Sequence, residues 1–347
     1  MRALRKILVV FGLLLAAAIG GAWWLSASVA KPGSHLVPLK IDVRQGETVR
    51  AVLTDLGRIG AIDDAVIVEL WARTLGDAPR VRVGRYEIPP GASAKEILRQ
   101  LDEGRVLLET LVVIEGTRYS DFRRSLAAHE GVRQTLAEVT DAELMARLGQ
   151  PGVHPEGRFF PDTYRFAWGT SDLEILKLAH SRLRERLEAA WADRADDLPF
   201  SEPAEALTLA SIVEKESALA EERPRVAGVF VQRLRKGMRL QSDPTVIYGL
   251  GDNYDGDIRT RDLRTDTPYN SYTRKGLPPT PIALPGEEAL RAATRPLETG
   301  ELFFVATGLS DGSHTFSRTY EEHRKAVRDM LDRQRSQRAV HTSKPSS

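Results

Sequence analysis

Residues 209–220 read LASIVEKESALA, and this stretch decides the organisation of the second half of the chain. Helical periodicity predicts a helix over residues 204–222, with side chains about 100° apart around the axis. On this wheel Glu216 falls in the middle of the apolar stripe, next to Ile212. Glu214 falls on the polar side. We therefore expect the two carboxylates in different surroundings, with Glu214 a solvated helix charge.

A carboxyl group that faces a core loses hydration, which disfavours its charged form and raises its pKa. Such a group keeps a proton near neutral pH and can donate it to a leaving group. Glu216 is therefore the candidate acid. The structural alternative is that Glu216 forms a buried ion pair with Arg233 or Arg239, and the helix alone favours neither interpretation.

Polar and aromatic residues follow this helix, in a Gly-, Pro- and Tyr-rich region over residues 242–286 that is predicted to be a loop. Tyrosine offers a flat apolar ring with a polar tip, and Asn and Gln side chains can bind hydroxyl and acetamido groups. The candidate substrate contacts have this chemistry: Gln241, Tyr269, Asn270 and Tyr272.

The first residues predict a membrane anchor. No charged residue occurs over residues 7–30, and about 20 apolar residues suffice for a helix to cross a bilayer. Three basic residues within residues 1–6 place the N-terminus in the cytoplasm and export the remainder. A cleaved signal peptide ending near residues 28–30 is the alternative, and the length of the apolar segment favours the uncleaved anchor.

The composition excludes several classes of function. The chain has no cysteine, so it has no disulfide framework, and its formal net charge is +1, which implies no basic surface for nucleic acid. The seven histidines show no His-x-x-x-His spacing, and neither a Gly-x-Ser-x-Gly turn nor a phosphate loop occurs. We therefore predict no metal and no cofactor.

A short motif recurs after a linker at residues 31–39. Apolar residues stand six and ten positions after the glycine of each copy, which predicts a strand, a glycine turn and a helix. With a further helix over residues 65–75, this pattern predicts a small α+β module over residues 40–105, suited to binding or spacing. The three copies read KIDVRQG at residues 40–46, YEIPPG at residues 86–91 and LVVIEG at residues 111–116.

The second half of the chain, residues 106–335, is predicted to form a separate domain. Its further helices are expected over residues 172–195, 224–236 and 319–335. The polar segment of residues 336–347 is predicted to be a disordered tail.

In this order the segments strongly resemble the endolytic murein transglycosylase family, also called YceG-like. The resemblance runs from the anchor to about residue 333. Ser271 stands where the family often has Thr, and Thr280 where Gly is frequent, although Thr tolerates positive φ poorly. The motifs that carry it are FPDT at 160–163, ASIVEKE at 210–216, QSDPTVIYG at 241–249, YNSY at 269–272, GLPP at 276–279 and HTF at 314–316.

This resemblance implies an α+β fold with three parts: a transmembrane helix, a small module similar to LysM, and a mixed α+β catalytic domain like that of lytic transglycosylases. It implies Glu216 as the catalytic acid and base, with Asp243 and His314 added to the substrate contacts. Glycan strands of peptidoglycan are the expected substrate, and the product would carry a 1,6-anhydroMurNAc end. Such cleavage is expected to terminate glycan elongation.

The resemblance also implies a cellular setting. The protein is expected as a single-pass protein of the cell inner membrane with its catalytic part in the periplasm, and penicillin-binding synthases are the expected partners. Two alternatives stay open. One is a lysozyme-like hydrolase that uses Asp243 or Asp162 as a second carboxylate. The other is a non-catalytic scaffold that binds the cell wall.

Overall fold

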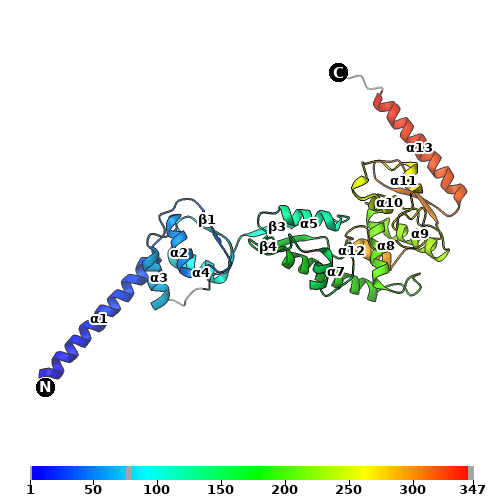
Figure 1. Cartoon of the computed structure of the whole chain (residues 1–347). Helices are drawn as coiled ribbons and strands as arrows, with labels where there is room; N and C mark the ends of the chain where they lie inside the picture. Colours follow the sequence, from blue (N-terminus) through cyan, green and yellow to red (C-terminus); the bar gives the residue numbers. More distant parts are fainter. Residues whose placement is uncertain (1, 76–79, 343–347) are drawn as a thin grey trace. The chain divides into compact units, whose positions relative to one another are not determined.

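The computed structural model describes residues 2–75 and 80–342, and the chain divides into two compact units (Figure 1). The first unit comprises the residues up to Thr110 together with His129–Arg133 and Arg165–Ser171. The second comprises Leu111–Ala128, Gln134–Tyr164 and the chain from Asp172 onward. Both units combine helices with small sheets, so the predicted mixed α+β architecture is confirmed.

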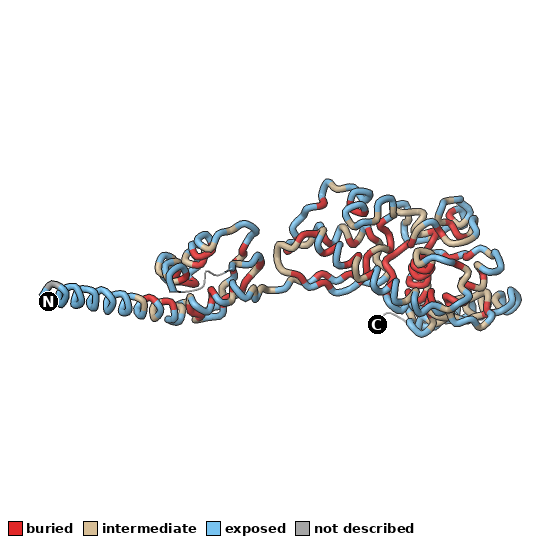
Figure 2. The backbone as a smooth tube through the Cα atoms, turned by 90° about the horizontal axis from the view of Figure 1, so that it is seen from below, coloured by how far each residue is buried: buried red, intermediate tan, exposed pale blue. Residues whose placement is uncertain are grey.

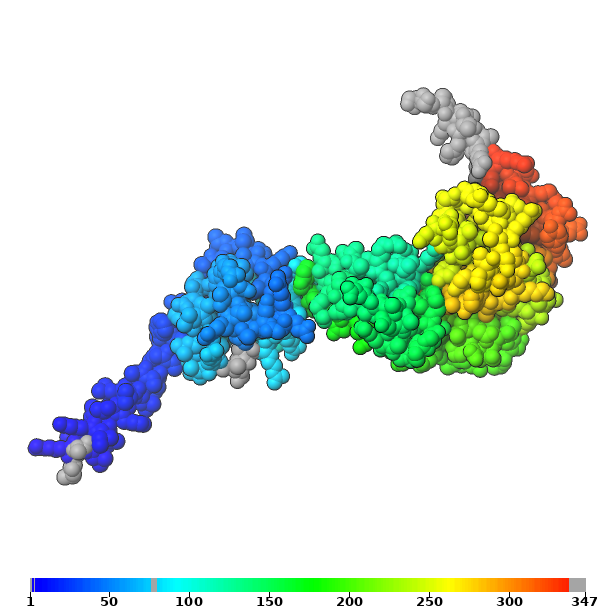
Figure 3. Space-filling model, viewed as in Figure 1, coloured from blue at the N-terminus to red at the C-terminus, as the bar shows by residue number. Residues whose placement is uncertain are grey.

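The chain begins with one long helix, α1 (Arg2–Ala30). Its segment Leu4–Ala30 is long and apolar enough to cross a membrane, a test that an N-terminal signal sequence also passes. Most of its side chains are exposed, as the pale blue N-terminal tube of Figure 2 and the uncovered blue helix of Figure 3 show. Only near its end do Leu25 and Val29 become buried, where α1 contacts α3 and α4.

The first unit is built on a two-stranded antiparallel sheet of β1 and β2, in which Ile41 lies opposite Tyr86. Both of these side chains are buried and join one apolar core with the inner faces of the helices. The elements of the unit are β1 (Leu39–Val43), α2 (Val49–Arg58), α3 (Ala65–Thr74), β2 (Gly84–Ile88) and α4 (Ala94–Glu103).

The three sequence copies fold as predicted. Each has a strand, a glycine with positive φ and a helix, the third pair being β3 (Leu108–Val112) and α5 (Tyr119–Ala128). Thr48 and Ser93 cap the first two helices by accepting backbone N–H bonds. The residues six and ten positions after each glycine are all buried: Val52 and Leu56, Ile97 and Leu101, Phe122 and Leu126.

The second unit is mainly helical. The strands β3 and β4 (Thr163–Ala167) pair with each other, and each is divided between the two units. The second unit also contains α5, α6 (Asp141–Arg147), α7 (Asp172–Ala192), α8 (Pro203–Glu216), α9 (Arg223–Arg235), α10 (Asp243–Leu250), the 3-10 turn η1 (Gly251–Asn253), α11 (Thr260–Arg264), α12 (Glu287–Thr294), the antiparallel pair β5 (Phe303–Ala306) and β6 (His314–Ser317), and α13 (Tyr320–Thr342).

Two predicted boundaries in this unit were wrong. The region of residues 242–286 is not all loop, because α10 and α11 form within it. Pro244 lies in the first turn of α10, where a missing N–H costs nothing. The last helix does not end at residue 335 but continues to Thr342, since no glycine or proline interrupts the chain there. Residues 343–347 of the predicted tail lie outside the described residues.

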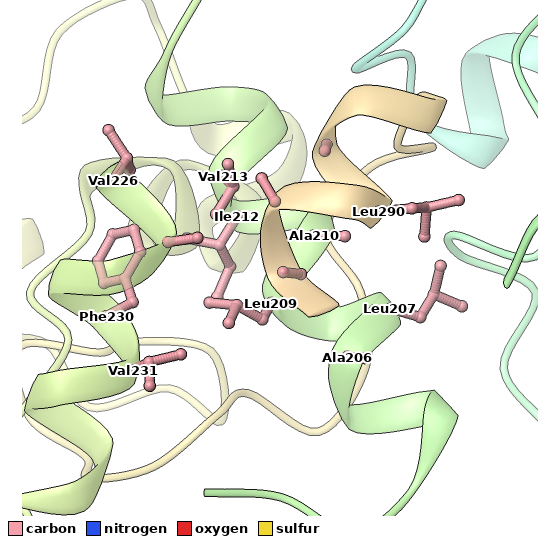
Figure 4. Close-up of a cluster of buried hydrophobic side chains, with 14 of the residues drawn as sticks. Ala206, Leu207, Leu209, Ala210, Ile212, Val213, Val226, Phe230, Val231 and Leu290 are labelled. Atoms are coloured by element: carbon pink, nitrogen blue, oxygen red, sulfur yellow. The ribbon is translucent and has the colours of Figure 1, made fainter. Parts of the chain in front are cut away.

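Helix α8 lies at the centre of the second unit. Every residue from Ala206 to Glu214 is buried, and α7, α9, α10 and α12 all contact the helix. Figure 4 shows its apolar side chains between those of α9 and α12. The helix therefore has no solvated face, and the polar side that the helical wheel assigned to it does not exist.

The predicted end of this helix was also wrong, because α8 stops at Glu216 and not at residue 222. Ser217 adopts an extended conformation, and its hydroxyl accepts a bond from the backbone N–H of Leu219. Such a local bond competes with the helical pattern. Arg223 donates to the carbonyl oxygen of Ser217, which stabilises the C-terminal end of the helix.

Candidate active site

Glu216 is the last residue of α8, and its side chain points to the segment that begins α10. The Ser242 hydroxyl donates to Glu216 Oε1 over 2.5 Å. Ser242 is itself fixed, because its N–H donates to Ser271 Oγ at 2.9 Å and its carbonyl oxygen accepts from Thr245 Oγ1 at 2.6 Å. Ser242, Ser271 and Thr245 are buried, whereas Glu216 keeps partial solvent exposure. The carboxyl group is thus held rigidly and stays within reach of a ligand.

Burial raises the pKa of Glu216 to about 7. The hydrogen bond from Ser242 and the charge of Arg233 act in the opposite direction, while the negative charge of Asp243 adds to the rise. The position of Glu216 at the C-terminal end of α8 also disfavours a negative charge, because the helix dipole is negative there. The carboxyl group of Glu216 is thus desolvated and its pKa is raised, as the sequence predicted.

Arg233 does not form the ion pair that the sequence left open. Its Nε donates to the Leu302 carbonyl oxygen at 2.7 Å, and its Nη1 donates to the carbonyl oxygen of Leu240. Within residues 2–75 and 80–342 the structure contains no ion pair between Glu216 and an arginine, and Arg239 is exposed. Arg233 therefore affects Glu216 in two ways. Its positive charge lowers the pKa of Glu216, and its bond to the Leu240 carbonyl oxygen fixes the backbone just before Gln241.

Gln241 has an unusual backbone. Its φ of 52° is the only positive value among the described non-glycine residues, and this region costs most side chains free energy. Its N–H donates to the Ser271 carbonyl oxygen, and Arg233 holds the preceding carbonyl group. Contacts on both sides thus maintain the strained conformation, which leaves the exposed Gln241 side chain next to Ser242.

Asp243 and Tyr272 form the other side of the site. The Tyr272 hydroxyl donates to Asp243 Oδ1 at 2.6 Å. Burial raises the pKa of Tyr272, and the hydrogen bond to Asp243 raises it further. The negative charge of Asp243 raises the pKa of Glu216. The structure therefore brings Gln241, Asp243 and Tyr272 together around Glu216.

The polar side chains of the remaining predicted contacts are bound by other groups of the protein. Asn270 is 1% exposed, and its amide donates to the carbonyl oxygens of Asp262, Leu263 and Thr265. Its oxygen accepts from the Tyr272 N–H. The side chain therefore fastens the loop that carries Tyr272 and has no free group for a ligand.

Tyr269 and His314 are likewise engaged by the protein. The Tyr269 hydroxyl lies 2.8 Å from Thr280 Oγ1, and its ring packs against Tyr248. The φ of Thr280 is not positive, so a threonine at this position, where the family often has glycine, causes no backbone strain. His314 lies 2.7 Å from Glu222 through Nδ1, which ties β6 to the start of α9.

Glu214 is the clearest correction to the sequence analysis. Its side chain is 3% exposed and pairs with Arg223 at 2.7 Å, while its second oxygen accepts from the Gly286 N–H. Burial raises the pKa of Glu214. The helical wheel assumed solvent on this side of α8, but the loop before α12 covers it. Glu214 is therefore a buried structural anion.

Glu156 is a second buried acid that the sequence analysis left unassigned. It is 3% exposed, accepts from the Tyr119 N–H at 2.9 Å and from the Tyr248 hydroxyl at 3.2 Å, and burial raises its pKa to about 7. The sequence offered one sign of this role, a glutamate directly before Gly157 and shortly before the FPDT motif of residues 160–163. Through Tyr248 it supports α10, whose first residue is Asp243.

The described residues contain no group of three or more His, Cys, Asp or Glu side chains placed to hold a metal ion. The groups around Glu216 offer a ligand a proton donor (Glu216), hydrogen-bond partners (Gln241 and Asp243) and an aromatic ring (Tyr272).

Comparisons with known proteins give one family. Residues 41–329 match the YceG-like family. An endolytic murein transglycosylase of Bacillus subtilis (strain 168) is 29% identical over 328 residues, 89% of each chain. Another from Streptococcus pneumoniae is 25% identical, and the alignment covers 84% of this chain and 58% of that protein. The crystal structure of a yceG-like protein from Listeria monocytogenes is 27% identical with a TM-score of 0.52, covering 83% of this chain and 98% of that one.

Replacing Arg223 by methionine should strongly destabilise the protein. The change leaves the Glu214 carboxylate buried without its cation, which costs about 3–5 kcal/mol of the free energy of unfolding. Chemical denaturation measures it. Arg291→Met, which removes an exposed arginine from α12, should change the stability by at most about 0.5 kcal/mol. Equal effects of the two changes would contradict a structural role for the Glu214 pair.

Replacing Asp243 by asparagine should lower the pKa of Glu216, because it removes a negative charge that raises this pKa. A reaction that needs protonated Glu216 should then lose activity at lower pH than in the wild type. The pH profile of kcat/KM measures this alkaline limb. Asp266→Asn is the matched control, since Asp266 is exposed and pairs with Arg274. An alkaline limb that stays in place in Asp243→Asn would refute the coupling.

Glu156 should make the protein less stable as the pH rises. Its pKa is higher in the folded state than in the unfolded state, so its contribution is fully present below pH 4.5 and is lost as the pH rises through about 7. The loss amounts to at most about 3 kcal/mol. Denaturation at pH 5 and pH 8 should show a smaller difference for Glu156→Gln than for the wild type, whereas Glu288→Gln at an exposed site should match the wild type. An unchanged difference in Glu156→Gln would count against this assignment.

Proposed function

The chain belongs to the YceG-like family, and on this premise we propose that it is a lytic transglycosylase that cuts within peptidoglycan glycan strands. The names of the Bacillus and Streptococcus relatives support this activity. The observation that carries the proposal is Glu216, a carboxyl group with a pKa raised to about 7 and held at a partly open site by Ser242.

The proposed reaction uses Glu216 twice. The protonated carboxyl group donates its proton to the oxygen that links MurNAc C1 to GlcNAc, and this bond breaks. The carboxylate then takes the proton of the MurNAc 6-hydroxyl while that oxygen attacks C1. The products are a 1,6-anhydroMurNAc end and a free GlcNAc hydroxyl, and no water is added. One group suffices because the attacking hydroxyl belongs to the substrate.

The surroundings of Glu216 suit a group that must both give and take a proton. A pKa near the working pH balances the protonated fraction against the strength of the base. Burial and Asp243 favour the acid form, while the Ser242 hydroxyl and the charge of Arg233 stabilise the carboxylate that forms on proton transfer. These opposing effects keep both forms accessible.

Substrate contact is proposed for the exposed groups beside Glu216. Gln241 offers an amide, Asp243 a carboxylate and Tyr272 an aromatic ring at the site. Asn270, Tyr269 and His314 would act indirectly, because their polar atoms are bound by other parts of the protein.

A hydrolase is the second candidate, because Asp243 is electrostatically coupled to Glu216. Glycosidases that add water use two carboxyl groups on either side of the scissile bond. Asp243 would then act as the second group. Asp162 is less suited to this role, since it pairs with Arg182 at 2.5 Å.

The first unit is proposed to hold the enzyme near its substrate. Its strand–helix–helix–strand order from β1 to β2 supports a LysM-like module over residues 40–105 that binds peptidoglycan. The apolar α1 supports a single-pass anchor over residues 7–30 in the cell inner membrane, with residues 1–6 cytoplasmic and residues 106–335 periplasmic. Penicillin-binding synthases are proposed as partners at the growing strand, where such a cut would terminate elongation.

Incubating the full-length chain in detergent with uncrosslinked glycan strands should release fragments that end in 1,6-anhydroMurNAc, detected by mass spectrometry. Glu216→Gln should reduce the rate by at least about a hundredfold, because the amide cannot donate the proton.

Glu221→Gln changes an exposed glutamate in the segment between α8 and α9, and this variant should cleave at the wild-type rate. Reducing MurNAc ends would show a hydrolase instead. Strands that bind without being cut, with no difference between the wild type and Glu216→Gln, would favour a scaffold.

A further inference from the structure

The second unit has another groove, at the opposite end of α8 from Glu216. It has a volume of about 700 Å³ and lies between the loop before β4, the start of α8 and the proline-rich segment of residues 276–281. Thr208 borders this groove, whereas Glu216 ends the helix eight residues later. At 1.5 Å per residue the two positions are roughly 12 Å apart along the axis. The Glu216 site and the groove are thus separate places in one rigid helical core.

The groove contains a cation without a partner. Arg158 lines it, and its Nε is buried with no hydrogen-bond acceptor. No ion pair or side-chain hydrogen bond of Arg158 occurs in the part of the chain that the structure describes. A buried donor that is left unsatisfied costs about 1–3 kcal/mol. An uncompensated guanidinium in a groove is therefore an arrangement that a bound anion would relieve.

Neighbouring groups do not supply that anion. Glu205 also borders the groove, but its carboxylate accepts the backbone N–H groups of Ser201 and Glu202 at 2.9 and 3.1 Å. Burial lowers the pKa of His154, the charge of Asp141 acts in the opposite direction, and the charge of Arg158 lowers the pKa further. Arg158 supplies the localised positive charge of the groove, and its fork of N–H groups matches a carboxylate.

The walls suit a short peptide with small apolar side chains. Pro279 and Pro281 on one side and Phe200 on another provide flat apolar surfaces. Proline has no backbone N–H, so these surfaces contact side chains and leave Arg158 as the polar anchor. The proline-rich segment also connects the groove with the Glu216 site, because it belongs to the chain segment of residues 272–281. At the start of this segment Tyr272 bonds to Asp243, and near its end Thr280 bonds to Tyr269.

We propose that this groove binds the stem peptide of a peptidoglycan strand, with a carboxylate of the peptide on Arg158. The proposal rests on the proposed function, which places the sugar chain at Glu216. A stem peptide of four residues spans roughly 13 Å when extended, which matches the separation along α8. The groove would then select strands that still carry their peptides.

The test compares peptide-bearing uncrosslinked strands with the same strands stripped by an amidase, using the full-length chain in detergent. Arg158→Met should lower kcat/KM on peptide-bearing strands about tenfold or more, because it removes a charge-assisted contact. It should leave kcat/KM on stripped strands unchanged. Arg184→Met is the matched control, since Arg184 is exposed on α7 and pairs only weakly with Glu188; it should affect neither substrate.

Two further measurements separate the groove from the folding of the variant and from the proposed reaction. Arg158→Met should keep or raise the Tm, because it removes an unpaired buried charge. Calorimetric titration with free stem tetrapeptide should show binding to the Glu216→Gln enzyme and at least tenfold weaker binding when Arg158 is also replaced.

The proposal would be overturned if Arg158→Met lowered kcat/KM equally on both strand types, or changed it on neither. It would also be overturned if the tetrapeptide bound equally well with and without Arg158. If the wild type cuts neither strand but binds the tetrapeptide through Arg158, the groove is a peptide site and the proposed reaction fails. If it cuts strands without binding the tetrapeptide, the reaction stands and the groove assignment fails.

Discussion

The burial of α8 on all sides is the constraint on which the rest of the structure depends. Helices α7, α9, α10 and α12 surround it, and it ends where Ser217 leaves the helical conformation. Glu216, the last residue of α8, lies at the boundary between core and solvent. Glu216 therefore combines the desolvation of a core residue with the access of a surface residue, which neither a fully buried nor a fully exposed glutamate would have.

Two glutamates separated by one lysine illustrate how neighbours divide structural and chemical roles. Glu214 is matched by Arg223 and by the Gly286 N–H, so its charge is satisfied within the protein. Glu216 has only a hydroxyl partner and the more distant charge of Arg233. An ion pair would hold Glu216 ionised and remove its proton from use. The absence of that pair from the described residues is consistent with a group that exchanges protons.

Much of the site consists of residues that hold other residues. Ser242 bonds Glu216, Ser271 and Thr245 hold Ser242, and Asn270 fastens the loop from which Tyr272 reaches Asp243. The positive φ of Gln241 is maintained by bonds on both sides of it. Rigid support of this kind limits reorganisation when charge moves, which is the main electrostatic contribution of a protein to catalysis.

The sequence by itself determined the local elements, because their signals are local. The glycine spacing predicted three strand–turn–helix units with the correct buried residues, and the uncharged N-terminal segment predicted α1. It also singled out Glu216, although by a helical wheel that wrongly supposed a solvated face and a longer helix. Only the tertiary structure decided that Glu214 is buried, that Asn270 is bound by backbone groups and that the Arg158 side chain has no partner among the described residues. These facts depend on which distant segments cover a side chain, such as the loop before α12 over Glu214. The periodicity of a helix contains no information about such contacts.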